Sequence, residues 1–192
     1  MELVFASNNQ HKVEEVQAII GSKIKLKSLN DIECHDEIPE TGNTFVENAG
    51  QKSRFVFDRY DLDCFADDSG LEIDALNGEP GVHSAHYSGS RDFQENISLV
   101  LKRLEGKTDR KARFKTVISL IIAGKEHLFE GIIEGRISSQ QSGKKGFGYD
   151  PIFIPEGYEI SFAEMSAEEK NKISHRAKAM EKLIQFLNSQ LS

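Results

Sequence analysis

Two adjacent carboxylates are the residues of this sequence that most directly suggest a reaction. Asp67 and Asp68 follow the short apolar run 64–66 and precede Ser69 and Gly70. Neighbouring carboxylates repel each other unless a cation offsets their charge, and Mg²⁺ binds carboxylate oxygens while keeping waters that can be activated. A turn with a capping residue is the alternative, since the spacing is not that of an EF-hand loop. We therefore expect either a metal-assisted hydrolytic site or a plain turn.

A polar run at a predicted strand-to-helix junction is the second candidate. A helix N-terminus presents unpaired N–H groups and the positive end of the helix dipole, which together favour a phosphate. Asn9 could cap the helix or contact a ligand, and Lys12 would add charge in the first turn. A plain N-cap beside a solvent-facing lysine is the alternative, because the chain has no GxxxxGK[ST] sequence. The run consists of Ser7, Asn8, Asn9, Gln10, His11 and Lys12.

An acidic loop at residues 36–42 is the third candidate, although acidic loops are usually just solvated. Glu40 would matter only if the fold brings it to Asp68 as a second oxygen ligand for a metal ion. Glu47 competes for that role, but together with Thr44 it forms the capping-box pattern that begins a helix. Glu40 is therefore the preferred second ligand.

Aromatic residues flanked by glycines, followed by a basic segment, form the fourth candidate. Rings at positions 147 and 149 could stack on a nucleotide base, and the carboxylate at 150 could accept its hydrogen bonds. An ordinary packed turn is the alternative. The residues concerned are Phe147, Gly148, Tyr149, Asp150, Lys170, His175 and Arg176.

The charge balance limits the partners of the protein. The 192 residues include 24 basic and 31 acidic side chains, and the formal net charge is −7. A general DNA or RNA binder would show the opposite balance, so we expect no nucleic-acid partner. A nucleoside triphosphate, with about four negative charges near neutral pH, would need Mg²⁺ and local lysines to approach this chain.

The sequence also predicts a cytoplasmic protein without a membrane partner. It has no apolar run of the roughly 18 residues that a spanning helix needs, and residues 1–6 do not read as a signal peptide. Cys34 and Cys64 lie in different segments without a CxxC spacing, so we expect two reduced thiols.

Apolar periodicity predicts alternating strands and helices. Strands are expected at 3–6, 24–29, 64–66, 114–123, 127–133 and 151–154. The third of them ends at Asp67, a hairpin turn is expected at Gly124-Lys125, and residues 138–148 are expected to form a loop. Helices are expected at 11–20, 44–57 and 93–104. The capping pattern at 166–169 indicates the start of another helix, and the apolar positions from Met180 to Leu191 define a C-terminal helix. Such a pattern favours an α/β fold with a mixed central sheet and flanking helices, built as a single domain over residues 1–192.

The order of these motifs resembles the inosine triphosphate pyrophosphatase family, over essentially the whole chain from Leu3 to about Leu183. The matching segments are 7–12, 39–42, 65–71, 78–81, 146–151, 162–166, 169–170 and 174–176.

This resemblance implies Mg²⁺-dependent hydrolysis of deaminated purine nucleoside triphosphates (ITP, dITP and XTP) to the monophosphate and pyrophosphate. It also implies two lobes around a substrate cleft, and a homodimer. By position, Asp68 would activate water and touch the metal, with Glu40 as the other ligand. The triphosphate would be held by residues 7–12 and Lys170 with Ser69 beside it, and the purine by residues 147–150, His175 and Arg176.

The chain departs from the family pattern in two places. Asn8 stands where many relatives carry glycine, and His86 stands where they commonly carry arginine, which would weaken a phosphate or dimer contact unless Arg91 substitutes. Two other functions stay open: a related pyrophosphatase acting on pyrimidine or modified nucleotides, and a nucleotide-binding sensor without turnover. Retention of both Asp67 and Asp68 argues against a pure sensor, which gains little from an extra repelling carboxylate.

Overall fold

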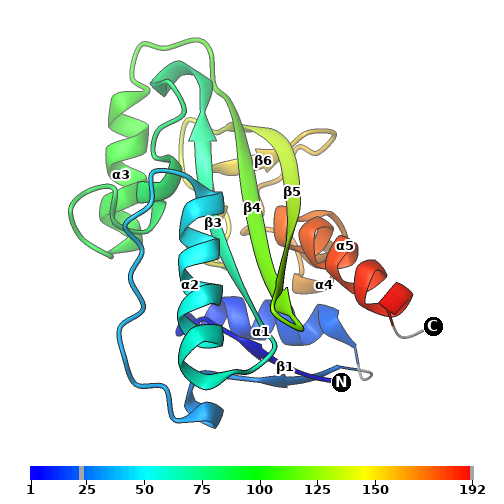
Figure 1. The fold of residues 1–192 in the computed structure, drawn as a ribbon. Helices are drawn as coiled ribbons and strands as arrows, with labels where there is room; N and C mark the ends of the chain where they lie inside the picture. Colours follow the sequence, from blue (N-terminus) through cyan, green and yellow to red (C-terminus); the bar gives the residue numbers. More distant parts are fainter. Residues whose placement is uncertain (22–23, 191–192) are drawn as a thin grey trace. The chain divides into compact units, whose positions relative to one another are not determined.

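The computed structural model describes residues 1–21 and 24–190, and Figure 1 traces this chain from β1 to α5. In these residues six strands form one sheet in the order β2-β1-β3-β4-β5-β6. β1 is parallel to β2 and β3, whereas β5 is antiparallel to β6. The predicted mixed sheet is therefore confirmed. The strands are β1 (Glu2–Phe5), β2 (Lys25–Lys27), β3 (Cys64–Ile73), β4 (Lys111–Ile122), β5 (Lys125–Ile137) and β6 (Phe153–Pro155).

The helices also lie close to their predicted positions. The capping boxes that begin α2 and α4 confirm the sequence signals at Thr44 and Ser166. α3 agrees with the predicted helix at 93–104 to within one residue. The C-terminal helix begins at His175, before its first strongly apolar position, and its predicted end at Leu191 falls outside the described residues. The helices are α1 (Gln10–Ile20), α2 (Phe45–Tyr60), α3 (Phe93–Arg103), α4 (Ala167–Ile173) and α5 (His175–Gln190).

Contacts divide the described residues into two compact units. Unit 1 is formed by the described parts of Met1–Asp68, Thr116–Gly131 and Arg176–Ser192. Unit 2 is formed by Ser69–Lys115 and Ile132–His175. The long strands β3, β4 and β5 each run through both units.

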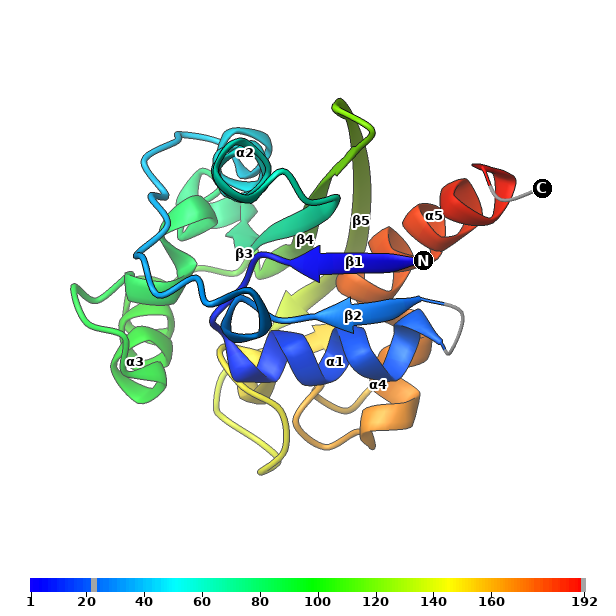
Figure 2. The same cartoon turned by 60° about the horizontal axis from the view of Figure 1, so that its bottom comes forward.

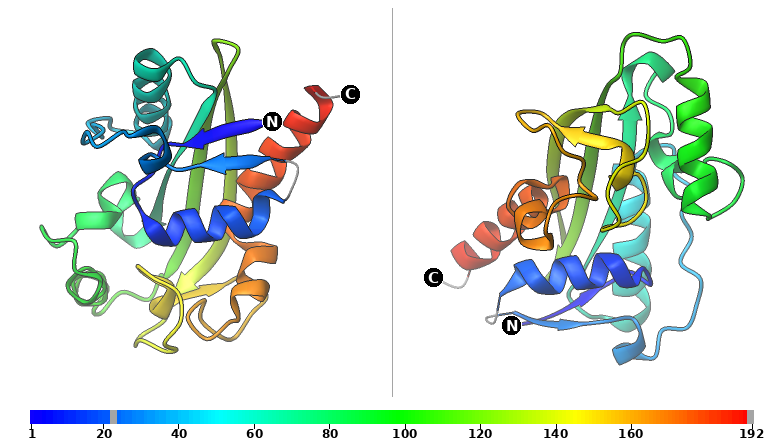
Figure 3. Two further views of the ribbon diagram at one scale, coloured as in Figure 1. Left: turned by 90° about the horizontal axis from the view of Figure 1, so that it is seen from below. Right: turned by 180° about the vertical axis from the view of Figure 1, so that it is seen from behind.

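Unit 1 is built on the two faces of β1. Leu3 and Phe5 pack in one apolar cluster with α1 and α5, whereas Val4 packs in another with Val56 of α2. Because alternate residues of a strand point to opposite faces, this pattern places α1 and α2 on opposite sides of β1 (Figure 2). Figure 3 shows α1 running alongside β1 and β2.

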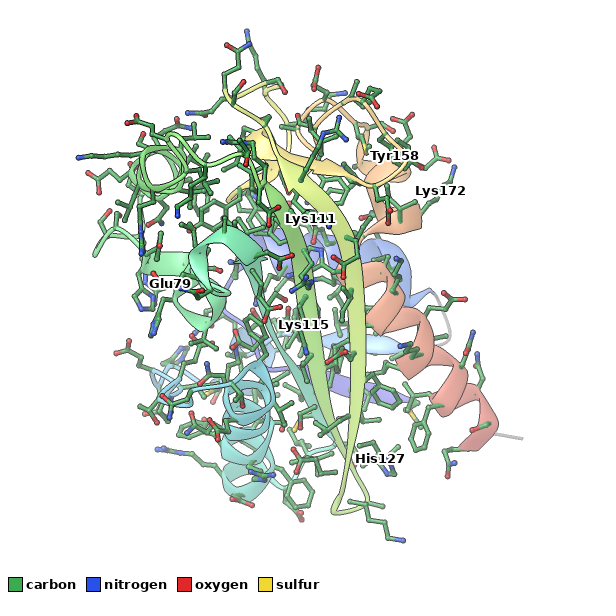
Figure 4. The ribbon with its side chains drawn as sticks, turned by 90° about the horizontal axis from the view of Figure 1, so that it is seen from above. Glu79, Lys111, Lys115, His127, Tyr158 and Lys172 are labelled. Atoms are coloured by element: carbon green, nitrogen blue, oxygen red, sulfur yellow. The ribbon has the colours of Figure 1, made fainter. Side chains whose placement is uncertain are left out.

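Unit 2 has its own core. The centroid of the Phe114 ring, on β4, lies 4.6 Å from the ring centroid of Phe153 and 6.1 Å from that of Phe162. In the part of β4 that belongs to unit 2, alternate positions are charged, and Figure 4 shows two of them, Lys111 and Lys115, along the strand. This part of the strand is therefore apolar on its core face and polar on the other, as a half-buried strand requires, whereas residues 116–121 are buried on both faces.

Strand β3 differs from the prediction, because it continues through Asp67, Asp68, Ser69 and Gly70 to Ile73. Aspartate and glycine, which supply three of these four residues, disfavour strands by propensity. The strand is sustained instead by tertiary contacts, since the two carboxylates meet buried cations (below) and Ile73 is buried at its far end. Tertiary context has overridden local propensity here.

Two smaller features follow from backbone chemistry. Ala123 and Gly124 join β4 to β5 with φ values of 48° and 73°, the conformation of a two-residue type I′ hairpin. β6 begins at Phe153 rather than at the predicted Pro151, because proline has no N–H to donate to a strand ladder; residues Asp150–Ile152 form a 3₁₀ turn, η4, instead.

Cys34 and Cys64 are buried free thiols, as predicted. None of the described helices has the length and apolarity that crossing a membrane requires.

The capping box of α2 offers a test of this local structure. Thr44 Oγ1 accepts a hydrogen bond from Glu47 N at 3.1 Å, so Thr44→Ala should lower the free energy of unfolding by about 1 kcal/mol. Thr44→Ser should restore it, and Thr108→Ala at an exposed position should leave it unchanged. Urea unfolding of the three variants checks this; equal midpoints for Thr44→Ala and the parent protein would contradict it.

Candidate functional site

A buried carboxylate on β3 holds two cations from α1 and α5. Asp67 is 2% exposed; its Oδ1 lies 3.1 Å from Lys12 Nζ, and its Oδ2 lies 3.2 Å from Arg176 Nη2 and 3.3 Å from Arg176 Nε. The three residues are far apart in sequence, so this contact fixes α1 and α5 against β3. From the sequence, Asp67 was expected to lie beside Asp68, but no separate role was predicted for it.

Arg176 is held from a second side by α1. Its Nη1 donates to Glu15 Oε2, and Glu15 lies three residues after Lys12, which puts both on the same face of the helix. Burial alone would lower the pKa of the Arg176 guanidinium, but the carboxylates of Asp67 and Glu15 outweigh burial and raise it. Arg176 is thus a permanently charged group paired with two carboxylates.

Asp68 points to the other face of β3, because consecutive strand residues alternate. Its Oδ2 accepts a hydrogen bond from Asn48 Nδ2 at 3.0 Å, and its Oδ1 lies 3.9 Å from Lys52 Nζ. Both partners come from the buried face of α2. The repulsion expected between the Asp67 and Asp68 carboxylates is therefore reduced, because they lie on opposite faces of β3 and each has polar partners of its own.

The acidic loop is attached to α2 by three successive residues. Lys52 Nζ donates to Glu40 Oε1, Thr41 N donates to Gln51 Oε1 at 2.9 Å, and Gly42 N donates to Asn48 Oδ1 at 2.8 Å. A side chain at Gly42 would place its Cβ 2.5 Å from Glu47 Cβ and 2.8 Å from Asn48 Oδ1, so this close approach needs glycine. Lys52 contacts both Glu40 and Asp68, so Glu40 lies in the neighbourhood of Asp68, the condition under which it could act as a second oxygen ligand.

Burial and charge act in opposite directions on the pKa values of this group. Burial raises the pKa of Asp68, and the ammonium groups of Lys52 and Lys12 offset that rise only in part. Burial lowers the pKa of Lys12 despite its contact with Asp67. For the partly exposed Glu40, Lys52 outweighs burial and holds the pKa below its usual value.

Unit 1 therefore gathers carboxylates and cations in nearly equal number. A divalent cation would make such a group net positive and able to receive a polyanion. The carboxylates are Glu15, Glu40, Asp67 and Asp68, and the cations are Lys12, Lys52 and Arg176.

The polar run before α1 is organised as a helix start. Asn9 Oδ1 accepts from Lys12 N at 3.2 Å and caps the helix, as one of the two interpretations predicted, and Ser7 Oγ accepts from Asn9 N at 3.2 Å. Asn8, Gln10 and His11 are exposed. Of this run, the contacts place Lys12 with the buried carboxylates.

A second polar group lies in unit 2. Asp150 is buried, and its Oδ2 accepts from Lys170 Nζ at 2.8 Å and from Phe147 N at 2.9 Å. Lys170 Nζ also lies 5.0 Å from the centroid of the Phe147 ring, within the range of a cation–π contact. Gly146, at φ +75°, would place a Cβ 2.1 Å from Asp150 Oδ2, so the loop can close on this carboxylate only with glycine there.

The remaining predicted residues of unit 2 are placed less directly for ligand contact. Tyr149 is buried in the core and donates its hydroxyl to Ser84 O at 2.8 Å. The His175 ring stacks on Phe114 at 4.8 Å. Ser69 is half-buried on β3, and His86 is exposed beside His83.

Sequence reasoning missed Asn48, Lys52 and Glu15. The first two could have been found, because Asn48 and Lys52 are four residues apart on the same helix face as Phe45, Ala49 and Val56, and polar residues on an apolar face need buried partners. Glu15 carried no such signal, since its partner Arg176 is remote in sequence.

Two carboxylates contacting one ammonium mark a position that favours a cation. The described residues contain no cluster of three or more His, Cys, Asp or Glu side chains placed to hold a metal ion. Mg²⁺ is commonly bound by one or two carboxylates together with waters and substrate phosphates. The pair Glu40 and Asp68 fits that mode of binding, and a retained water beside Asp68 could be deprotonated for hydrolysis.

Comparison with known proteins agrees with a hydrolytic site. Residues 3–186 match the Ham1 family. The chain is similar to a dITP/XTP pyrophosphatase of Flavobacterium psychrophilum, with 53% identity over 98% of this chain and 100% of that protein. It is similar to that of Bacillus subtilis with 45% identity over 98% of each. Among solved structures it resembles the Staphylococcus aureus Ham1 protein, with a TM-score of 0.91 and 38% identity over 99% of this chain and 100% of that one.

The contacts of Asp67 predict a large effect on stability. Asp67→Asn would leave the buried charges of Lys12 and Arg176 without their shared counter-ion, and breaking a buried ion pair costs about 3–5 kcal/mol. Asp58→Asn, at an exposed carboxylate, should change the free energy of unfolding by less than about 0.5 kcal/mol. Denaturant unfolding measures both; a loss below about 1 kcal/mol for Asp67→Asn would show that this carboxylate does not stabilise the buried cations.

Proposed function

The chain belongs to the Ham1 family, and we propose that it hydrolyses deaminated purine nucleoside triphosphates (ITP, dITP and XTP) to the nucleoside monophosphate and pyrophosphate. The relatives described above are dITP/XTP pyrophosphatases along nearly their whole length, and this chain is a nucleoside triphosphate pyrophosphatase of the same kind. The observation that carries the proposal is the buried carboxylate of Asp68, which lies 3.9 Å from the Lys52 ammonium and accepts a hydrogen bond from Asn48.

Asp68 is the proposed general base. A water attacks the α-phosphorus as it gives its proton to the Asp68 carboxylate, the bond between the α-phosphorus and the bridging oxygen to the β-phosphorus breaks, and pyrophosphate leaves with that oxygen. Burial supports this role, because it raises the pKa of Asp68 above that of an ordinary aspartate and so makes its carboxylate a stronger base. Lys12, with residues 7–11 beside it, would hold the triphosphate and stabilise the charge of the leaving group.

Glu40 and Asp68 are the proposed Mg²⁺ ligands. When bound, the ion would neutralise phosphate charge and lower the pKa of a coordinated water. The loop contacts of Thr41 and Gly42 keep Glu40 near α2, so the two carboxylates need little rearrangement to bind a cation.

The loop of unit 2 is the proposed base site. A purine would stack on the Phe147 ring, and an arginine or a backbone N–H would donate a hydrogen bond to its 6-oxo group, whereas the 6-amino group of adenine would present a second donor there. Lys170 remains a proposed contact of the triphosphate. His175 and Arg176 complete the proposed base contacts, with Gly148, Tyr149 and Asp150 shaping the loop and Ser69 beside the phosphates. Within this set, Asp150 acts by positioning Lys170 and Phe147.

The proposed enzyme acts as one domain over residues 1–192. The family match over residues 3–186 supports this, since it includes both compact units. A homodimer and a cytoplasmic location complete the proposal on the strength of the family resemblance.

The substrate class is tested by a panel. Pyrophosphate release should be fast with ITP, dITP and XTP and slower by at least about tenfold with ATP and dTTP, and it should stop when EDTA removes the divalent metal. Strong activity on dTTP with none on dITP would indicate a pyrimidine pyrophosphatase instead. Nucleotide binding without any pyrophosphate release would indicate a sensor.

The catalytic role of Asp68 is tested by its amide. Asp68→Asn should reduce kcat for dITP by about 10²–10⁴, the usual contribution of a general base, while the free energy of unfolding changes far less than in Asp67→Asn. Asp58→Asn is the matched control and should keep the parent kcat. An unchanged kcat for Asp68→Asn would remove this residue from the reaction.

A further inference from the structure

Lys52 is the buried cation that the proposed reaction leaves without a role. It is 7% exposed, its ammonium donates to Glu40 and lies 3.9 Å from Asp68 Oδ1, and these are the two carboxylates proposed to bind the metal. The region that a metal ion would occupy is thus adjacent to a positive charge belonging to the chain itself.

The two carboxylates are held in place independently of Lys52. Asp68 is fixed on β3 and accepts a hydrogen bond from Asn48. The loop that carries Glu40 is fixed by the backbone N–H groups of Thr41 and Gly42, which donate to side chains of α2. The carboxylates would therefore remain near each other without the lysine, and some cation is needed to offset their repulsion.

We propose that the Lys52 ammonium serves as a stand-in cation between the Glu40 and Asp68 carboxylates, and that it gives up these contacts when a divalent metal ion binds. An ammonium and a metal ion repel each other in a partly desolvated region, so the two cannot share the carboxylates without cost. The inference rests on the proposed metal-dependent function, but it concerns only the binding of the metal ion to the protein in the absence of nucleotide.

The exchange would link metal binding to substrate binding. A lysine released from Glu40 keeps its charge on a flexible four-carbon stem, and a phosphate oxygen brought in with the metal is the acceptor it would then need. Lys52 is on this account a positioning residue: it keeps the carboxylate pair assembled before the metal arrives.

The test measures thermal unfolding as MgCl₂ is titrated without nucleotide. The parent protein should respond weakly, because the ion must displace Lys52. Lys52→Met should have a lower Tm without metal and recover most of that loss with Mg²⁺. Its half-maximal Mg²⁺ concentration should be lower by about tenfold or more, the effect expected when a charge within about 4–6 Å is removed.

Three control variants separate this mechanism from loss of packing. Lys170→Met removes a lysine of similar burial that pairs with the single carboxylate of Asp150; it should lower the Tm without gaining a response to Mg²⁺. Lys52→Arg keeps the charge and should behave like the parent. In Glu40→Gln/Lys52→Met the carboxylate pair is abolished, so the Tm without metal should rise above that of Lys52→Met and the response to Mg²⁺ should be lost.

An unchanged Mg²⁺ midpoint in Lys52→Met, or a lowered Tm that Mg²⁺ does not restore, would overturn the inference. The outcome is separable from that of the proposed function. If the parent protein failed to hydrolyse dITP, the proposed pyrophosphatase activity would be refuted, but the Mg²⁺ titration of Tm could still be interpreted. Normal hydrolysis with no difference between Lys52→Met and the parent in the titration would refute the exchange alone.

Discussion

Charges buried in this protein are matched by charges from distant parts of the chain, and the carboxylate of Asp67 is the centre of that arrangement in unit 1. It binds Lys12 from α1 and Arg176 from α5, which lie 55 and 109 residues away in sequence. A desolvated cation without a counter-ion is unfavourable by several kcal/mol, so neither helix can shift from β3 without exposing or abandoning its charge. The position of the proposed phosphate-binding lysine is thereby fixed by the stability of the fold.

The two-residue repeat of β3 gives neighbouring carboxylates different chemistry. Asp67 faces α1 and α5 with Phe65, whereas Asp68 faces α2 with Ala66. Asp67 meets cations at hydrogen-bond distance and serves as their counter-ion. Asp68 meets an amide and a more distant ammonium, so burial dominates and its pKa rises. A counter-ion and a proposed general base are therefore obtained from one dipeptide by the geometry of a strand.

The sequence predicted the element order and the mixed sheet well, because these follow from apolar periodicity and from local signals such as the capping boxes at Thr44 and Ser166. It did not predict that β3 continues beyond Ala66, since aspartate and glycine disfavour strands and the two carboxylates are stabilised by remote cations. For the candidate site, Glu40 was named as a second ligand on condition that the fold brings it to Asp68. Asn48 and Lys52 could have been recognised as polar residues on an apolar helix face, but the carboxylates that they contact become visible only when α2 is placed against β3.

Pairing every central cation with a carboxylate also explains how an acidic chain could receive a polyanion. Lys12 and Lys52 are neutralised internally before any ligand arrives, so at long range the protein presents its net negative charge rather than an attractive patch. Attraction must then come with the substrate, and a nucleoside triphosphate that arrives with one Mg²⁺ has about half of its own charge neutralised. On the proposed mechanism, binding would be an exchange of partners, in which phosphate oxygens replace carboxylates around the ammonium groups and the metal replaces ammonium around the carboxylates. Such an exchange conserves the number of paired charges, and this conservation is what allows it to occur in a partly desolvated site.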